Sequence, residues 1–268
     1  MIDVTRISNN VPEGDGYIGQ DGLLHCLKCG GALETYINVL GRGERKVRCI
    51  CECMRKERDA AELRAKAEQI DRNRRICFGG SRLAKCTFEK SRDTEYIRMA
   101  KNYVKNFDKF RADGKGLLLY GVVGTGKSHI AACVANALLN AEKKVLMTNF
   151  ATIINTLQNS FEGRQEYIDS LNRYSLLIID DLGTERSSEY MQENVFNIID
   201  ARYRSGLPMI ITTNLTGEQL QNPKEISYAR IYERILERCH PIEVKGASIR
   251  KQKLQSDYIG VEKLLKGV

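Results

Sequence analysis

From Gly116 onward, short apolar runs alternate along the chain with stretches that have the composition and period of helices. A run that is apolar throughout is typical of a strand buried on both faces, and strands that alternate with helices indicate a parallel sheet. The predicted strands are 117–120, 144–148, 176–179, 209–214 and 242–244, and helices are expected from 127 to about 142 and over about 225–239. The pattern therefore predicts an α/β fold with a parallel sheet flanked by helices.

The first 75 residues have a different pattern. Residues 1–24 are polar and rich in Gly and Asp, which predicts a mobile lead-in, and 25–53 is rich in cysteine. Residues 54–75 contain no Gly or Pro and only a thin apolar stripe, which predicts a solvated helix or linker. Phe78-Gly79-Gly80 interrupts this helix. We expect a small module with a helical linker over 1–75 and a larger domain over 76–268.

Composition narrows the class of protein. The 268 residues are 42% hydrophobic and 28% charged, as in an ordinary folded protein. No apolar run approaches the roughly 18 residues of a membrane helix, and the N-terminus lacks the apolar core of a secretion signal. We therefore expect a cytoplasmic protein with no membrane partner, whose nine cysteines are thiols or metal ligands. The net charge of +8 permits a polyanionic partner.

One segment fits the phosphate-binding pattern G-x-x-x-x-G-K-[ST] in full, between a predicted strand and a predicted helix. Its residues are Gly121, Val122, Val123, Gly124, Thr125, Gly126, Lys127 and Ser128. Glycines let backbone N–H groups converge on phosphate oxygens, and the helix N-terminus adds positive potential. Lys127 should reach the β- and γ-phosphates of ATP, and Ser128 should hold Mg²⁺.

Two further predicted strands end in polar residues on the same side. Asp180 and Asp181 follow Leu176–Ile179, as in a Walker B strand, and Asn214 ends the strand at 209–214. Ligands of open α/β sheets bind at the carboxyl ends of strands, so Asp180 should orient Mg²⁺ and Asp181 should polarise the attacking water. A helix cap for the two aspartates, or a turn at Asn214, is the alternative.

Five cysteines crowd into the first module. Cys26 and Cys29 have the spacing of a zinc knuckle, and Cys49, Cys51 and Cys53 supply the second half. Structural zinc takes four tetrahedral ligands, so one of these cysteines is spare. The remaining four, Cys77, Cys86, Cys133 and Cys239, are scattered and are expected in or beside the core.

Two other segments have both a functional and a structural interpretation. Arg230, Arg234 and Arg238 recur every four residues of one predicted helix, so they form either a salt-bridged face or a source of an arginine finger. Between 149 and 175 aromatic and basic residues interleave, which suits single-stranded nucleic acid but equally suits core packing. Its members are Phe161, Arg164, Tyr167, Arg173 and Tyr174.

The order GVVGTGKS, LLIIDDLGTE, IITTN, RIYERI and GASIR resembles AAA+ helicase loaders of the DnaC/DnaI type, over about residues 76–250. The cysteine-rich front end looks like that of prophage-encoded members. The resemblance implies an AAA+ P-loop ATPase that self-associates through this domain and delivers a replicative hexameric helicase onto single-stranded DNA. It also implies that 1–75 docks the helicase.

The resemblance assigns roles by position. Asn214 becomes sensor I, Arg234 the arginine finger and Arg250 sensor II. Because loader-like sequences end the cysteine module in Cys-x-Cys, the zinc ligands become Cys26, Cys29, Cys51 and Cys53, with Cys49 in reserve.

Two departures affect the expected turnover. Asp181 stands where most AAA+ proteins have Glu, and only 18 residues follow Arg250, too few for a full helical lid. Both suggest slow, switch-like use of ATP. The nearest rival function is an IstB-like transposition ATPase. A DNA-binding adaptor with negligible turnover is another, whereas a small-molecule P-loop kinase has no use for a zinc arm.

Overall fold

The computed structural model describes residues 16–41, 43–159, 163–183 and 189–266. The chain divides into two compact units, Met1–Gln69 and Ile70–Val268. The long helix α1 (Glu52–Phe78) begins in the first and ends in the second, so the boundary lies a little before the expected 75/76. Within the described ranges, no helix has both the length and the apolar character needed to cross a membrane.

The first unit contains two small antiparallel pairs of strands. β1 (Gly16–Ile18) pairs with β2 (Leu24–Cys26), and β3 (Glu34–Val39) pairs with β4 (Gly43–Arg48). The expectation of a mobile lead-in is therefore wrong for residues 16–24, whereas 1–15 lie outside the described residues. The buried core of this unit consists of Cys26, Leu33 and Cys51. Such a small core buries little apolar surface, so the unit needs another source of stability.

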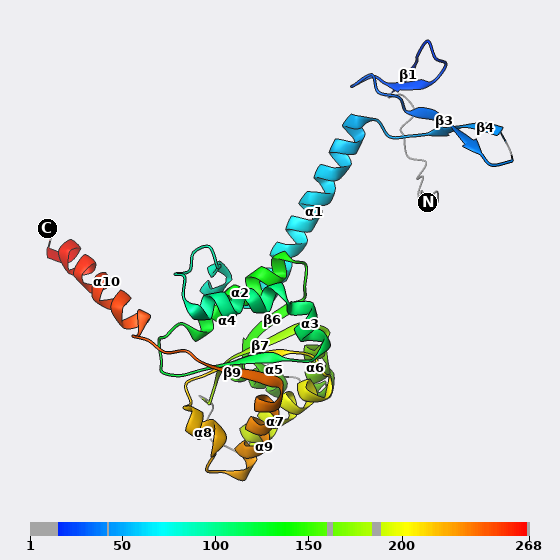
Figure 1. The fold of residues 1–268 in the computed structure, drawn as a ribbon. Helices are drawn as coiled ribbons and strands as arrows, with labels where there is room; N and C mark the ends of the chain where they lie inside the picture. Colours follow the sequence, from blue (N-terminus) through cyan, green and yellow to red (C-terminus); the bar gives the residue numbers. More distant parts are fainter. Residues whose placement is uncertain (1–15, 42, 160–162, 184–188, 267–268) are drawn as a thin grey trace. The chain divides into compact units, whose positions relative to one another are not determined.

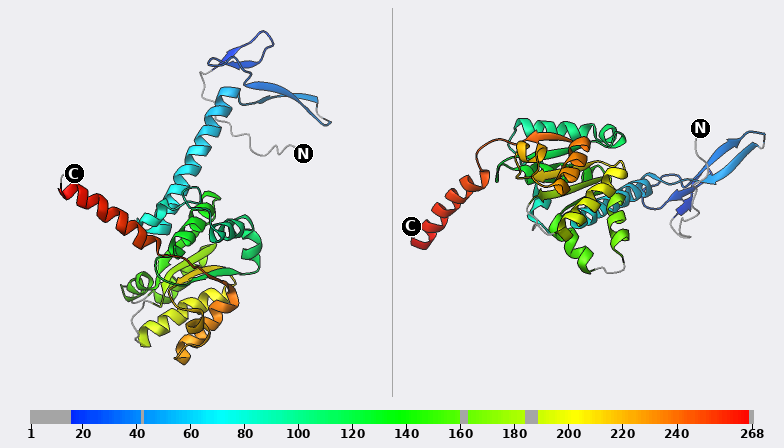
Figure 2. Two further views of the ribbon diagram at one scale, coloured as in Figure 1. Left: turned by 60° about the vertical axis from the view of Figure 1, so that its left-hand side comes forward. Right: turned by 90° about the horizontal axis from the view of Figure 1, so that it is seen from below.

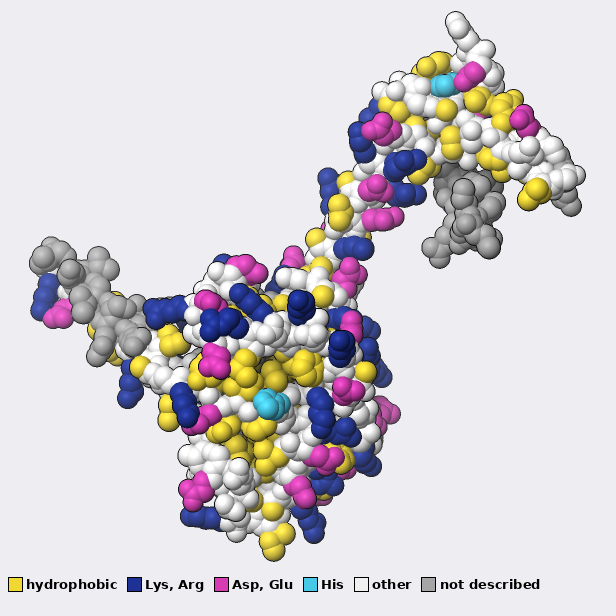
Figure 3. Space-filling model, in the orientation of Figure 1, with side chains coloured by type: hydrophobic (Ala, Val, Ile, Leu, Met, Phe, Trp, Pro, Cys, Tyr) yellow, Lys and Arg dark blue, Asp and Glu magenta, His cyan; other side chains and the backbone are white. Residues whose placement is uncertain are grey.

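Helix α1 is solvated along most of its length, as predicted. Residues 55–69 are all exposed, and basic and acidic side chains interleave along the helix (Figure 3). Ion pairs one turn apart, Glu52 with Lys56 and Arg58 with Glu62, support the exposed helix. The helix ends at Phe78, where Gly79 and Gly80 both have positive φ.

The second unit is built on a five-stranded parallel sheet in the order β6-β7-β8-β5-β9 (Figures 1 and 2). The strands are β5 (Gly116–Tyr120), β6 (Val145–Asn149), β7 (Leu176–Leu182), β8 (Met209–Thr213) and β9 (Cys239–Glu243). All five predicted strands are confirmed. The last strand begins at Cys239, earlier than predicted, because the exposed residues His240 and Pro241 interrupt the apolar pattern in the sequence. A strand at the edge of a sheet tolerates both residues.

Alternate residues of the strands face two separate cores. Leu117, Leu119 and Ile178 point to one core, and Leu118, Leu177 and Ile211 point to the other. The first face is covered by the end of α1 with α2 (Glu95–Lys105), α3 (Phe107–Ala112) and α4 (Lys127–Asn140). The second is covered by α5 (Phe150–Asn159), α6 (Arg164–Ser170), α7 (Glu189–Arg204), α8 (Gly217–Gln221) and α9 (Ile226–Arg238).

Two short 3-10 helices, η1 (Arg82–Lys85) and η2 (Leu171–Arg173), and the 18-residue last helix, α10 (Ile249–Lys266), complete the unit. The scattered cysteines lie where the sequence predicts. Cys77, Cys133 and Cys239 are buried, and Cys86 packs against the first core.

Candidate functional site

The phosphate loop joins β5 to α4 at the carboxyl edge of the sheet. Its backbone adopts left-handed conformations that favour glycine, with φ of 86° at Gly124 and 102° at Gly126. A Cβ at Gly124 would lie 2.1 Å from Ser248 Oγ, so a side chain is also excluded by space. Val122 and Val123 are exposed at the loop surface, and Thr125 is buried beneath it.

Lys127 is buried at the first position of α4, and its ammonium group donates three hydrogen bonds. The acceptors are the carbonyls of Gly121 and Val122 and Asn214 Oδ1, each at 2.8 Å. Burial lowers the pKa of Lys127, and the nearby carboxylates of Asp181 and Asp180 oppose that shift. Lys127 therefore lies in direct contact with Asn214, which the sequence places 87 residues further along.

Asp180 lies deeper than Asp181 and has hydroxyl partners from two elements. Thr212 Oγ1 of β8 donates to Asp180 Oδ1 at 2.6 Å, and the Ser128 hydroxyl of α4 also bonds to this carboxylate. Burial raises the pKa of Asp180, and the two hydroxyls work against that shift. A carboxylate beside a hydroxyl is an oxygen donor set of the kind that Mg²⁺ accepts in nucleotide sites. These residues therefore fit the expected ion.

Asp181 is exposed at the end of β7 and has an unusual backbone. Its φ is 60°, and the register of β7 against β8 shifts between Ile179 and Leu182, so the two aspartates form a β-bulge. Asn214 Nδ2 approaches Asp181 Oδ1 at 3.4 Å. Lys127, Asn214 and Asp181 thus form a connected chain of polar side chains at the carboxyl ends of the strands. Thr184 and Glu185 of the LGTE segment lie outside the described residues.

The first turn of α10 is tied to the phosphate loop. The Ile249 N–H donates to the Gly124 carbonyl at 3.0 Å, and Ser248 Oγ accepts from the Lys251 N–H at 3.3 Å. Arg250 is exposed in that turn. The expected sensor II residue therefore follows directly on a residue that contacts the loop.

The three arginines of α9 have different surroundings. Arg230 is exposed, whereas the Arg234 side chain is only 28% exposed. Arg234 Nε lies 2.9 Å from Asp200 of α7, and its guanidinium lies over the Phe196 ring at 4.5 Å. Arg238 lies over the Tyr203 ring at 4.8 Å. The charged partner of Arg234 is thus Asp200 of α7, while within its own helix Arg234 Nη1 donates to the Arg230 carbonyl at 3.4 Å.

The described residues of the aromatic and basic segment have different surroundings. Tyr167 packs against the second core, as the structural alternative predicted, and Arg164 lies 6.0 Å from the Tyr190 ring. Arg173 is exposed and Tyr174 is half-buried beside it. Phe161 lies outside the described residues.

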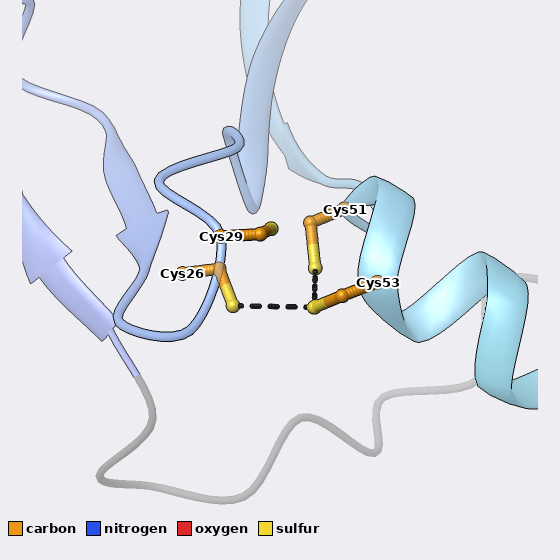
Figure 4. Close-up of side chains that lie close together, drawn as sticks. All are labelled: Cys26, Cys29, Cys51 and Cys53. Atoms are coloured by element: carbon orange, nitrogen blue, oxygen red, sulfur yellow. Dashed lines mark hydrogen bonds between the residues drawn. The ribbon is translucent and has the colours of Figure 1, made fainter.

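The first unit brings four of its five clustered thiols together (Figure 4). The sulfur atoms of Cys26, Cys29, Cys51 and Cys53 all lie within 4.8 Å of one another. Cys53 Sγ lies 3.6 Å from Cys26 Sγ and 3.2 Å from Cys51 Sγ. Around tetrahedral zinc, with Zn–S bonds of about 2.3 Å, sulfurs lie about 3.8 Å apart. The set therefore fits one structural zinc ion.

The fifth thiol is directed elsewhere. Cys49 Sγ donates to the Ala32 carbonyl at 3.4 Å, and burial raises its pKa. In contrast, backbone N–H groups of Gly31 and Cys53 lower the pKa of Cys29 to about 6. Hydrogen bonds with Cys51 and Cys29 raise the pKa of Cys53 to about 12. Four adjacent thiols share protons in this way, and a bound cation would replace them.

Two residues with direct contacts to the site were missed by the sequence reasoning. Thr212 bonds to Asp180, and Asp200 holds Arg234. Thr212 has a signal in the sequence, because a threonine within the apolar strand Met209–Thr213 needs a hydrogen-bond partner. Asp200 has none, since an acidic residue on a long helix is ordinary.

Comparison with known proteins adds to this geometry. A family described as IstB-like ATP binding protein matches residues 57–256. The chain is 31% identical over 144 residues to the replicative helicase loader DnaC of Escherichia coli strain K12, covering 50% of this chain and 58% of DnaC. It is 26% identical over 239 residues to the phage-like element PBSX protein XkdC of Bacillus subtilis strain 168, covering 83% of each. The crystal structure of DnaI aligns with a TM-score of 0.52 and 26% identity, covering 61% of this chain and 93% of that one.

These similarities support the AAA+ loader-type family that the motifs predicted, with its parallel sheet and nucleotide-binding ATPase activity in general. The chain spans just over half the length of the helicase loaders that it matches. The similarity to XkdC extends over most of both chains.

Proposed function

The chain belongs to the family of IstB-like ATP binding proteins, and from this we propose that it is an ATPase that loads a replicative ring helicase onto single-stranded DNA. The observation that supports this most is the meeting of Lys127, Asp181 and Asn214 at one sheet edge, in a chain similar to DnaC. The three residues indicate how ATP is used, and the similarity to DnaC indicates the partner.

The nucleotide step follows from the residues at the edge. Lys127 exchanges its carbonyl and Asn214 acceptors for the β- and γ-phosphates of ATP. Ser128 and Asp180 would hold Mg²⁺, and the ion would supply positive charge that neutralises the phosphate oxygens. Asp181 accepts a proton from the attacking water, and Asn214, beside both Asp181 and Lys127, orients that water. Asp181 is shorter than Glu by one methylene, so hydrolysis is slow and stimulated by the partner or by DNA.

The first unit has a separate role in this proposal. Residues 1–75 dock the helicase through the zinc-bearing module, and α1 joins that module to the ATPase unit. Zinc bound by Cys26, Cys29, Cys51 and Cys53 stabilises a module whose own core is three residues. Single-stranded DNA is bound by the ATPase unit as it self-associates.

The decisive experiment is a pull-down of the purified hexameric replicative helicase from the same cell with the full chain, with ATP and without it. A stable complex is expected, followed by transfer of the helicase to a single-stranded circle when ATP is present. The matched control is Asp181→Asn, which should capture the helicase but fail to release it. Absence of capture in every nucleotide state contradicts the loader role.

Two rival functions make different predictions in the same set of assays. An IstB-like transposition ATPase should assemble on duplex DNA with ATP and ignore the helicase; the match to that family favours this alternative. A nucleotide-switched adaptor should bind DNA but show the same negligible ATP hydrolysis with and without single-stranded DNA.

A further inference from the structure

The two aspartates of the ATPase site lie on a distorted part of the sheet. β7 and β8 pair regularly from Leu177 opposite Met209 to Ile179 opposite Ile211, and the next pair is Leu182 with Thr213. Asp180 and Asp181 therefore share the place opposite the single residue Thr212. Asp181 takes a left-handed φ of 60°, an uncommon conformation for residues other than glycine that aspartate adopts more readily than most.

Thr212 supplies bonds that enforce this geometry. Its side chain is fully buried, and its hydroxyl makes two hydrogen bonds within the bulge. Thr212 Oγ1 accepts from the Asp181 N–H at 2.9 Å and donates to Asp180 Oδ1 at 2.6 Å. One hydroxyl thus fixes the backbone of one aspartate and the carboxylate of the other, using its donor and one acceptor site together.

The neighbouring threonine provides an internal comparison. Thr213 is equally buried, and its hydroxyl also makes two bonds. It donates to the Leu182 carbonyl at 2.7 Å and accepts from the Leu215 N–H at 3.1 Å. Both partners of Thr213 are backbone groups, whereas Thr212 contacts a carboxylate of the site.

We propose that Thr212 is a positioning residue of the ATPase site, which rests on the proposed ATP hydrolysis. Its hydroxyl holds the Asp180 carboxylate beside Ser128 and holds Asp181 in the bulge that directs its side chain to Asn214.

The test compares three variants of the full chain: Thr212→Val, Thr212→Ser and Thr213→Val. Valine keeps the shape and removes the hydroxyl, serine keeps the hydroxyl, and Thr213→Val removes an equally buried hydroxyl that does not touch the carboxylates. The measurements are the affinity for a fluorescent ATP analogue with Mg²⁺ and with chelator, kcat and KM for ATP, and the midpoint of urea unfolding.

Thr212→Val should lose the gain in analogue affinity that Mg²⁺ gives the wild type, while affinity in chelator stays unchanged. Its kcat should fall by about 10²-fold, the usual effect of misplacing a catalytic group by about 1 Å. Thr212→Ser should restore both, and Thr213→Val should change only the unfolding midpoint. Equal effects of Thr212→Val and Thr213→Val on magnesium dependence would overturn the proposal, as would a Thr212→Val variant that behaves like the wild type.

The role of Thr212 can still be tested if Thr212→Val fails to fold or if the wild type does not hydrolyse ATP. If Thr212→Val does not fold, the same change is made in Asp181→Gly, because glycine adopts a positive φ without strain. Loss of magnesium-dependent binding in that pair is still expected, and its retention contradicts the role of Thr212. If the wild type itself does not hydrolyse ATP, the proposed function fails, and the magnesium dependence of analogue binding still decides the role of Thr212 toward Asp180.

Discussion

At the scale of single residues, the ammonium group of Lys127 is the feature most specific to phosphate. It is buried and surrounded by oxygen acceptors, and burial lowers its pKa while two carboxylates oppose the shift. A γ-phosphate offers this group stronger acceptors than backbone carbonyls do, because its oxygens carry negative charge and attract the ammonium group directly. In the proposed mechanism, ATP would therefore draw Lys127 away from Asn214 and leave the Asn214 amide free to orient the attacking water.

Substitutions at Lys127 and Asp181 should separate binding from chemistry. Lys127→Ala should abolish detectable binding of a fluorescent ATP analogue, because the loop positions no other charge. Asp181→Asn should bind the analogue normally, since Ser128 and Asp180 hold magnesium, yet lose hydrolysis by about 10²–10⁴-fold, the range for a general base. Steady-state phosphate release measures the second effect. Equal hydrolysis by the wild type and Asp181→Asn would remove Asp181 from the mechanism.

Residues that make up a local pattern could be predicted from the sequence, whereas residues that matter through long-range contacts could not. The eight-residue phosphate loop is contiguous, so its order alone indicates its chemistry. Thr212 acts across a bulge between β7 and β8, and the place of a bulge depends on strand pairing. Asp200 reaches Arg234 from another helix, and an isolated acidic residue carries no signal of such a partner.

At the scale of elements, different features of the sequence predicted the structure of the two units. The strands of the second unit are continuous apolar runs because both faces of the sheet are covered, and only β9, at the edge, was misplaced at its start. The first unit has short, mostly exposed strands, and none of β1–β4 was predicted, because their residues show no regular apolar pattern. Its cysteine spacing was the informative feature.

The cysteine group should bind one zinc ion per chain, and its ligands can be told apart by substitution. Cys29→Ser should reduce bound zinc and unfold the module, since zinc supplies on the order of 10 kcal/mol to such domains. Cys49→Ser, with its thiol turned to the Ala32 carbonyl, is the matched control and should keep zinc. Metal analysis and far-UV circular dichroism of the full chain measure both effects. The reverse order of severity would show that Cys49 is a ligand.

At the scale of the whole molecule, the two units should divide the work. A fragment over 70–268 keeps Arg74, which bonds to Asn136 and Asn140 of α4, so it suits the test better than one that begins at 76. It should bind the ATP analogue like the full chain but fail to capture the helicase in a pull-down. Capture as tight as that of the full chain would place the helicase contact on the ATPase unit.

The proposed self-association would require Arg234 to reach the ATP of a neighbouring subunit, whereas within its own subunit Arg234 is bound to Asp200 and stacked on Phe196. Asp200 also holds Arg204 at 2.9 Å, so it does not lose all its partners when Arg234 leaves. On assembly, the Arg234 guanidinium can therefore exchange the Asp200 carboxylate for phosphate oxygens, which a planar guanidinium binds with two hydrogen bonds. The carboxylate would then keep the finger folded away in the isolated subunit.

This exchange makes a prediction for Arg234→Ala. The variant should bind ATP normally and lose DNA-stimulated hydrolysis, by less than the roughly 10³–10⁵-fold of a GTPase finger because Asp181 already limits the rate. Arg204→Ala is the matched control, because it removes the other partner of Asp200 and should leave hydrolysis intact. Mixing Arg234→Ala with Lys127→Ala should restore activity, since a mixed interface joins an intact phosphate loop to an intact arginine. If the mixture stays inactive although the two variants co-assemble, Arg234 acts within its own subunit, through Asp200.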